Sequence, residues 1–266
     1  MNRTIKDLQD ALDGGHITQL ANDSREPELH GDQSFASIFD AYQHPSVYLV
    51  TGKPRKGKTH MIKSLILDKT LNEDIKADHR LSFGLVFCSE ASIHEYSGKR
   101  DTPGLIPKKY CIEGYKEDKL VQYLSFLKKR YDELGDLPRS FVLFDDLVGL
   151  LDSNSSAFTS FITCHRKYNV DVLLSVQYLK KNISPTIREC VSYAIMFNSK
   201  TELTIKALFE SFGELAGKYE DFKRLFFRQT REQYTAMLFI ELNETTDENY
   251  LSIKAPAEVP DVCLTW

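Results

Sequence analysis

The sequence predicts an α/β fold in which a mostly parallel central sheet is flanked by helices, with antiparallel strands from the C-terminal part of the chain added at one edge. Three observations lead to this prediction. Apolar, β-branched runs of strand length recur along the chain, segments with helical spacing lie between them, and the first run leads into a glycine loop that opens a helix. Strands separated by helices imply crossover connections and hence a parallel sheet.

The expected elements follow in chain order. The most regular helix should span 119–134, where apolar residues recur at helical spacing and Leu137-Pro138 stops the pattern. A long loop is expected over 89–107. The remaining expected elements are strands over 47–51, 82–88, 141–144, 172–176 and 193–197, helical segments over 60–67 and 202–228, and an antiparallel pair over 234–242 and 250–254.

Length and composition fit one α/β domain. The chain has 266 residues, of which 42% are hydrophobic and 27% charged, with a net charge of −4. We expect an N-terminal extension over 1–44, with short helices over 5–12 and 35–42, and one domain over 45–266. The 5 cysteines form no C-x-x-C pair, which argues against a zinc site. No signal-peptide core and no run of about 18 apolar residues is present, so we expect a cytosolic protein without a membrane partner.

Residues 52–59 fill every fixed position of the phosphate-binding motif G-x-x-x-x-G-K-[ST], or Walker A. The loop reads Gly52-Lys53-Pro54-Arg55-Lys56-Gly57-Lys58-Thr59, and His60 follows it in the expected helix. A strand that ends in a glycine loop opening a helix presents backbone N–H groups to an anion. We expect all these residues to bind a nucleotide, Lys58 at the β- and γ-phosphates and Thr59 at Mg²⁺. A basic surface loop is the alternative.

Two carboxylates follow the third apolar run, as in a Walker B motif. Asp145 and Asp146 come directly after Phe141–Phe144, at the strand end where ligands of open α/β sheets bind. We expect Asp145 to hold Mg²⁺ through water beside Thr59, and Asp146 to orient and polarise the attacking water as a general base. A solvated acidic turn is the alternative.

Gln177 follows the run Val172–Val176. In ATPases with an additional strand between the phosphate-loop strand and the acidic strand (ASCE type), a polar residue at this position contacts the γ-phosphate and senses hydrolysis. A glutamine can donate to a phosphate oxygen and accept from water. A polar cap on the strand end is the alternative.

The identity of the nucleotide is inferred by elimination. Asp146–Gly149 fits the D-x-x-G motif of GTPases, but Asn198–Thr201 does not supply their guanine-reading N-K-x-D. Arg139 and Arg166 are too scattered for the arginine-rich lid of a small kinase. ATP is therefore the expected nucleotide.

Several short motifs together resemble viral genome-packaging ATPases of the poxvirus, large-DNA-virus and virophage type, within the FtsK/HerA superfamily of P-loop ATPases. Their order and spacing carry the resemblance, which covers roughly residues 45 to 230. The motifs are the phosphate loop, Phe83–Phe87, Phe144–Leu147, Thr163–Asn169, Leu174–Gln177 and Ile183–Cys190. The resemblance implies a P-loop NTPase of the additional-strand type, with Asp145 as metal ligand, Asp146 as base and Gln177 as sensor.

The resemblance also implies a motor. It predicts a homo-oligomeric ring, a pentamer or hexamer, that uses ATP and Mg²⁺ to translocate double-stranded DNA, without reading its sequence, into a viral capsid. Capsid proteins would be partners of the motor. The motor would be located in the host cytoplasm, in the viral factory or in the virion. A monomeric P-loop switch and a cellular DNA-translocating ATPase of the same superfamily are the alternatives. Cellular members usually carry long additional domains or membrane anchors.

Ring ATPases complete each site with an arginine from the next subunit, since a guanidinium is always charged and bidentate toward phosphate. Arg188 is the first candidate and Arg166 the second; an ion pair of Arg166 with Asp145 or Asp146 in its own chain is the alternative. Lys56 stands where the family often has a small residue. Candidate DNA contacts are Lys99, Arg100, Lys108, Lys109, Lys180 and Lys181. For each of them taken singly, a place in a solvated charged loop is the favoured alternative.

Overall fold

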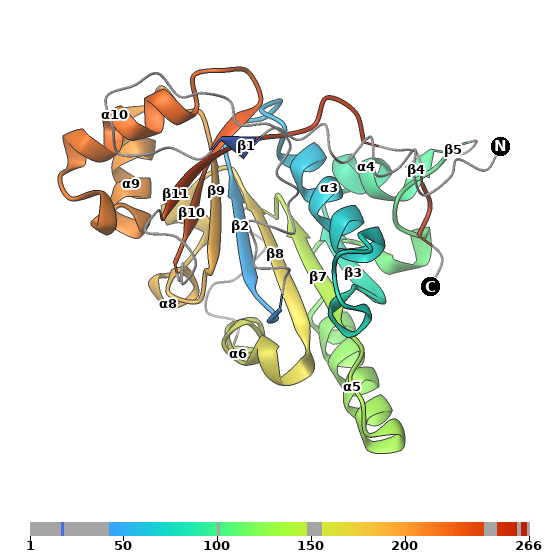
Figure 1. Ribbon diagram of the computed structural model, residues 1–266. Helices are drawn as coiled ribbons and strands as arrows, with labels where there is room; N and C mark the ends of the chain where they lie inside the picture. Colours follow the sequence, from blue (N-terminus) through green and yellow to red (C-terminus); the bar gives the residue numbers. More distant parts are fainter. Residues whose placement is uncertain are drawn as a thin grey trace.

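The computed structural model describes residues 17–18, 43–99, 102–147, 156–241, 249–259 and 262–264. Its main element is a sheet of nine strands in the order β1-β11-β10-β9-β2-β8-β7-β3-β6 (Figure 1). The strands are β1 (Ile17–Thr18), β2 (Val47–Thr51), β3 (Phe83–Cys88), β6 (Cys111–Glu113), β7 (Ser140–Asp145), β8 (Val170–Val176), β9 (Tyr193–Phe197), β10 (Thr235–Ile240) and β11 (Tyr250–Lys254). The helices are α3 (Lys58–Leu71), α4 (Ile93–Ser97), α5 (Glu117–Leu134), α6 (Ser156–Cys164), α7 (Leu179–Asn182), α8 (Pro185–Arg188), α9 (Glu202–Phe212) and α10 (Tyr219–Gln229).

The strand order confirms the predicted fold class. β2 pairs in parallel with β8 and β9, and β8 pairs in parallel with β7, so β8 is the additional strand between the phosphate-loop strand and the acidic strand. β10 pairs antiparallel with both β9 and β11, which places the predicted antiparallel pair beside β9.

The sheet separates two hydrophobic cores because successive strand residues point to opposite faces. In β2, Tyr48 and Val50 belong to one core, which α3 and α4 cover. Val47 and Leu49 belong to the other, which contains residues of α5, α6, α9 and α10. All five residues of β2 are buried, as expected for a central parallel strand covered on both faces.

The structure differs from the sequence-based expectation mainly at the edges of the sheet. The expected loop over 89–107 contains α4 and a small hairpin, β4 (Gly98–Lys99) with β5 (Thr102–Pro103), and the short edge strand β6 follows. β1 adds a strand from the N-terminal segment, paired with β11. The helices predicted over 5–12 and 35–42 lie outside the described residues, so they stay predictions, as does the division at residue 44.

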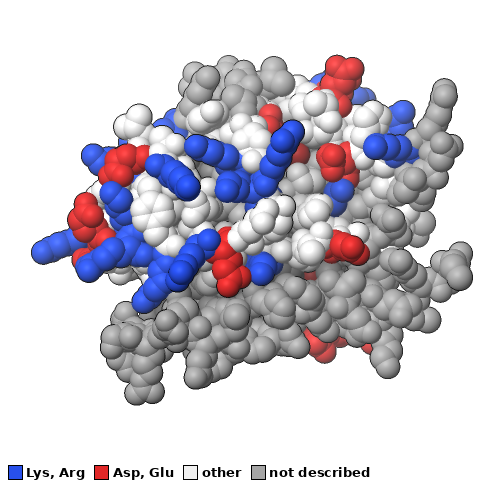
Figure 2. Space-filling view, turned by 90° about the horizontal axis from the view of Figure 1, so that it is seen from above, with Lys and Arg blue, Asp and Glu red and all other residues white. Residues whose placement is uncertain are grey.

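Basic side chains gather on one face of the molecule. Viewed from the side of the phosphate loop, Figure 2 shows Lys and Arg side chains over α9 and α10, with others near the middle of the face. Lys223 and Arg224 of α10 pair with Glu202 and Asp221, whereas the exposed Arg228 has no ion pair among the described residues. None of the described helices combines the length and apolar composition needed to cross a membrane.

Candidate nucleotide-binding site

The phosphate loop connects β2 to α3 at the end of the parallel strands. Gly57 caps α3 with a φ of 104°, a value that favours glycine. A Cβ atom on Gly57 would also lie 3.0 Å from the Cβ of Ala255 and 3.5 Å from Cδ1 of Tyr234. Glycine is therefore required at this position of the motif for two reasons: its backbone conformation, and the close approach of Ala255 and Tyr234.

Lys58 folds back over its own loop. Its Nζ donates to the carbonyl oxygens of Gly52 at 2.7 Å and Lys53 at 3.4 Å. Burial lowers the pKa of Lys58, and the charges of Asp146 and Asp145 act against this shift. A triphosphate would offer stronger, charged acceptors in the same place, so the ammonium is held where it can exchange carbonyl oxygens for phosphate oxygens.

The acidic side of the site lies at the adjacent ends of β7 and β8. Asp145 is 4% exposed, and burial raises its pKa although the hydroxyl groups of Ser175 and Tyr96 lower it. Both hydroxyl groups lie near the carboxylate, and neither has a hydrogen-bond partner among the described residues.

Gln177 and Asp146 contact each other directly. The side-chain amide of Gln177 donates to Oδ2 of Asp146, and the backbone N–H of Asp146 donates to the carbonyl oxygen of Ser175 at 3.0 Å. The other oxygen, Oδ1, is buried and has no partner among the described residues. The carboxylate is thus oriented through one oxygen and has its second oxygen available to accept a hydrogen bond.

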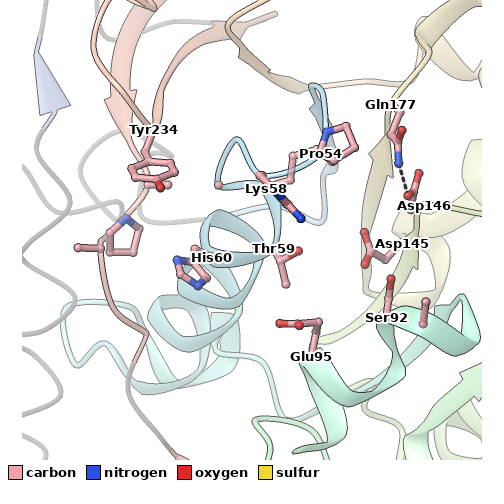
Figure 3. Close-up of a pocket in the computed structure, with 16 residues that line it drawn as sticks. Pro54, Lys58, Thr59, His60, Ser92, Glu95, Asp145, Asp146, Gln177 and Tyr234 are labelled. Carbon is pink, nitrogen blue, oxygen red and sulfur yellow. Dashed lines mark hydrogen bonds between the residues drawn. The ribbon is translucent and has the colours of Figure 1, made fainter.

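These groups line one cavity of about 650 Å³ (Figure 3). The lining residues are Pro54, Arg55, Gly57, Lys58, Thr59, His60, Ala91, Ser92, Glu95, Asp145, Asp146, Gln177, Tyr234, Ala255, Pro256 and Ala257. Figure 3 shows the end of the Lys58 side chain directed toward Asp145 and Asp146, while Tyr234 lies on the other side of the loop. The cavity therefore has an acidic end and an end formed by aromatic and small residues.

Backbone strain also concentrates here. Among the described residues, four that are not glycine have a positive φ, and three of them line the cavity: Arg55 at 62°, Asp146 at 50° and Tyr234 at 64°. Such conformations cost energy and cluster at functional sites.

The two predicted arginines lie away from this cavity. Arg188 ends α8 and donates to Oγ of Ser211 at 2.8 Å. The N–H of Ser192 donates to the carbonyl oxygen of Val47 at 3.0 Å, which places this segment at the start of β2, whereas the phosphate loop follows its end. β2 is 5 residues long, so the two edges are about 16 Å apart.

Arg166 lies at the same edge as α8, in the 3₁₀ turn His165–Tyr168 that precedes β8. Nε2 of His165 lies 3.2 Å from the carbonyl oxygen of Pro45, just before β2. The alternative of an ion pair between Arg166 and Asp145 or Asp146 of the same chain is therefore wrong.

The sequence-based reasoning missed several residues of the cavity. Ser92 and Glu95 come from the segment after β3, where a loop was expected, and Glu95 lies 3.9 Å from Lys63 on α3. Tyr234 directly precedes β10, and Ala255–Ala257 directly follow β11. No local motif marks these positions, although β3 is a neighbour of the acidic strand and its end therefore faces the same edge.

The side chains present fit a Mg²⁺ ion bound together with a triphosphate. No group of three or more His, Cys, Asp or Glu side chains able to hold a metal by themselves occurs among the described residues. Mg²⁺ in nucleotide sites takes one or two carboxylates with phosphate oxygens and waters. Asp145 and Thr59 supply donors of that kind in one cavity.

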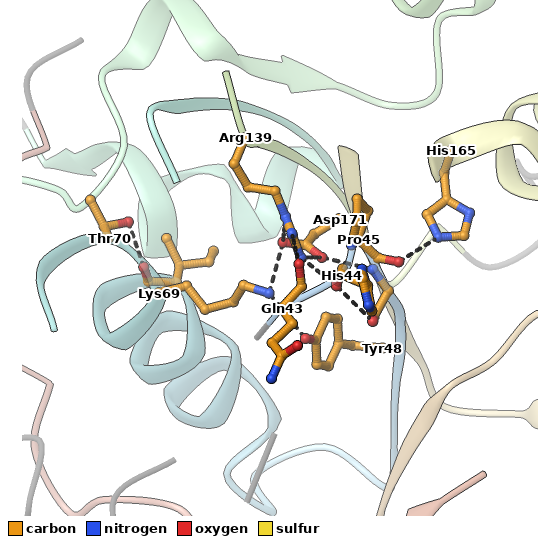
Figure 4. Close-up of polar contacts among 11 residues, drawn as sticks. Gln43, His44, Pro45, Tyr48, Lys69, Thr70, Arg139, His165 and Asp171 are labelled. Carbon is orange, nitrogen blue, oxygen red and sulfur yellow. Dashed lines mark hydrogen bonds and ion pairs between the residues drawn. The ribbon is translucent and has the colours of Figure 1, made fainter. Parts of the chain in front are cut away.

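A buried ion cluster holds the opposite end of β2 (Figure 4). Asp171 of β8 accepts from Lys69 at 2.7 Å, from the guanidinium of Arg139 at 2.9 and 3.0 Å, and from the backbone N–H of Ser46 at 2.8 Å. Burial would raise the pKa of Asp171, but Lys69 and Arg139 bring it below its ordinary value. Burial lowers the pKa of Lys69 to about 8. The cluster joins α3 and β8 to Arg139, which precedes β7, and to Ser46, which precedes β2.

The comparisons with known proteins agree with this architecture. No model of a known protein family and no curated protein sequence matches the chain. Among solved structures, the DNA-packaging ATPase B204 from Sulfolobus turreted icosahedral virus is similar, with a TM-score of 0.52, 16% identity, and coverage of 81% of this chain and 100% of B204.

Two further similar structures are larger proteins. The pCW3 conjugation coupling protein TcpA has a TM-score of 0.51 at 12% identity, over 94% of this chain and 67% of TcpA. The cytoplasmic domain of the type VII secretion ATPase EccC from Thermomonospora curvata has a TM-score of 0.52 at 13% identity. The match covers 96% of this chain and 32% of the EccC chain. At these identities the likeness establishes the fold, which is that of the P-loop ATPases. The similar structures include a viral genome-packaging ATPase, the group that the sequence motifs resemble.

Proposed function

We propose that this protein is an ATPase. The observation that carries the proposal is that the phosphate loop, two carboxylates and Gln177 line one cavity, although they are far apart in the sequence. Structures of B204 from Sulfolobus turreted icosahedral virus 2 in complex with ATP-gammaS and AMPPCP, which have the same fold, support a nucleotide as the ligand.

The proposed reaction assigns one task to each side chain. The loop N–H groups and Lys58 hold the β- and γ-phosphates. Oδ1 of Asp146 accepts a hydrogen bond from water and takes its proton as the water oxygen bonds to the γ-phosphorus and the bond to the bridging oxygen of ADP breaks. Mg²⁺, when bound through Thr59 and Asp145, neutralises charge on the phosphate oxygens. Gln177, by its bond to Asp146, links the position of the base to the neighbouring strand β8.

We further propose that hydrolysis drives translocation of double-stranded DNA by a ring of subunits, and that the cargo is a viral genome entering a capsid. The ordered motifs and the fold shared with B204 support this assignment. The basic face over α9 and α10 (Figure 2) offers positive charge that can bind phosphates without reading sequence. Two predicted DNA contacts have partners within the chain: Lys180 pairs with Glu210, and Nζ of Lys109 lies 4.7 Å from the centre of the Tyr110 ring.

Phosphate release and nucleotide binding test the ATPase proposal. Lys58→Ala should abolish both. Asp146→Asn should keep ATP binding and lower the turnover rate by roughly 10² to 10⁴, whereas Asp132→Asn, on the exposed surface of α5, should have wild-type turnover. If Asp146→Asn turned over at the wild-type rate, Asp146 would not be the general base.

The mass in solution with a non-hydrolysable ATP analogue, with and without double-stranded DNA, tests the ring. A ring whose hydrolysis rises with DNA supports translocation. A chain that stays monomeric under all these conditions and hydrolyses slowly would instead be a nucleotide-dependent switch, and the motor proposal would be wrong.

A further inference from the structure

The proposed hydrolytic reaction uses only the end of the cavity near the carboxylates. It assigns no role to the other end, which Tyr234 and Ala255–Ala257 line. The γ-phosphate belongs beside Asp145, Asp146 and Gln177, because the base and sensor act on it. The rest of the nucleotide must then extend along the loop away from the carboxylates. Figure 3 shows Tyr234 on that side of Lys58 and His60, and Tyr234 with Ala255–Ala257 lines this part of the cavity.

The Tyr234 ring is accessible and its backbone is held in place. The residue is 42% exposed, so a ligand can cover part of its surface. Its carbonyl oxygen accepts from the N–H of Ala255 at 2.9 Å, and Cδ1 lies 3.5 Å from the position that a Cβ of Gly57 would occupy. The ring thus stands directly beside the phosphate loop.

Tyr234 also adopts a φ of 64°, which is unfavourable for a bulky side chain. Tyr234 ends the turn that leads into β10, in which the N–H of Thr235 donates to the carbonyl oxygen of Glu232 at 3.4 Å. In this conformation Tyr234 lines the cavity. Strain of this kind is a feature of ligand-binding positions.

We propose that the ring of Tyr234, with the apolar surface of Ala255 and Pro256, is the platform on which the nucleotide base stacks. The inference rests on the proposed function, since it assigns the base end of the same nucleotide site. The chemical class of ligand is a nucleoside triphosphate with an aromatic base. Every base has a π-face, so stacking contributes affinity without reading the base edges, in keeping with the lack of a guanine-reading motif in the sequence.

The alternative is that Tyr234 only packs against the phosphate loop. The two roles differ in which ligands they affect. A stacking platform contributes to ATP binding and not to the binding of inorganic tripolyphosphate, which carries the same phosphate chain without sugar or base. A packing residue affects both ligands equally, because both depend on the loop.

Calorimetric titration of the full chain with ATP and with tripolyphosphate, both in the presence of Mg²⁺, separates these roles. Tyr234→Ala should weaken ATP binding by roughly tenfold or more, the size of one lost stacking contact, and leave tripolyphosphate binding within twofold of wild type. Tyr234→Phe, which keeps the ring, should bind ATP as wild type does. Tyr131→Ala, at an exposed tyrosine of α5 outside the cavity, is the matched control.

Each other outcome is decisive. An equal loss of both ligands in Tyr234→Ala, or unchanged ATP affinity, would overturn the stacking role while leaving the ATPase proposal intact. Failure of the wild-type protein to bind either ligand would overturn both proposals.

Discussion

Replacement of Asp171 by asparagine should destabilise the protein by about 3 to 5 kcal/mol, the cost of breaking a buried ion pair by removing one partner. Asp171 is 0% exposed and accepts from two cations. Asparagine has nearly the same shape and can still accept from Ser46, so the change isolates the charge. What remains is the burial of two positive groups without their counter-ion.

The two cations do not contribute equally to this loss. Burial lowers the pKa of Lys69 to about 8 although Asp171 raises it, so in Asp171→Asn that pKa falls further and Lys69 can release its proton near pH 7. Arg139 is 2% exposed and its guanidinium stays protonated at any ordinary pH. Most of the destabilisation should therefore come from the stranded charge of Arg139.

Urea unfolding, followed by circular dichroism, measures this effect. Asp221→Asn, which breaks the pair with Arg224 at the surface of α10, is the matched control and should cost no more than about 1 kcal/mol. If Asp171→Asn lowered the free energy of unfolding by less than its control does, the ion cluster would not stabilise this end of β2 as described above. The pKa of Asp171 is lowered in the folded state, so its contribution is present above the unfolded pKa of about 3.9 and is lost as the pH falls through the folded value. Asp171→Asn should lack this part of the acid sensitivity.

Two further predictions concern the site and the sheet. Because burial raises the pKa of Asp145 in the free protein, its protonation should reduce kcat/KM for ATP hydrolysis, the parameter that reports the free enzyme, at a higher pH than for an exposed aspartate. The same shift means that the charge opposes folding, so Asp145→Asn should lose hydrolysis without any fall in the free energy of unfolding, and a clear fall would contradict the assignment. Gly84→Ala should destabilise the protein by about 1 to 3 kcal/mol through overpacking, since a Cβ there would lie 2.2 Å from the Phe141 ring. Urea unfolding checks this, and an unchanged midpoint would show that the ring moves aside at little cost.

The central strands could be predicted because each is a continuous apolar run. The predicted bounds of β2 and β9 match the structure, since polar or glycine residues flank both runs. β6 has only three residues, too few for any period to show. α3 is longer than predicted at both ends, because it begins at Lys58 and Thr59 of the phosphate loop and continues through Leu71.

The candidate site could be predicted only where a local motif exists. Lys58, Asp145 and Gln177 each follow a strand that the sequence reveals, and parallel strands end at one edge. Tyr234 reaches the loop because β10 runs antiparallel beside β9, a pairing across the sheet that no local pattern encodes. Asp171 did leave a signal: it is a lone charge inside the apolar run Val170–Val176, and a buried charge requires a partner.

The positions of Arg166 and Arg188 connect the proposed chemistry with the proposed ring. Within one chain, Lys58 and Arg55 are the positively charged side chains, among the described residues, that line the cavity, and both belong to the phosphate loop. An arginine at the opposite edge of the sheet cannot reach the γ-phosphate of its own chain. It can reach that of another chain where an interface brings this edge of one chain to the phosphate-loop edge of the next, and a heterologous interface of that kind, which joins two different surface patches, can close into a ring. A catalytic role for either arginine would therefore require the assembled form, and hydrolysis would then depend on assembly.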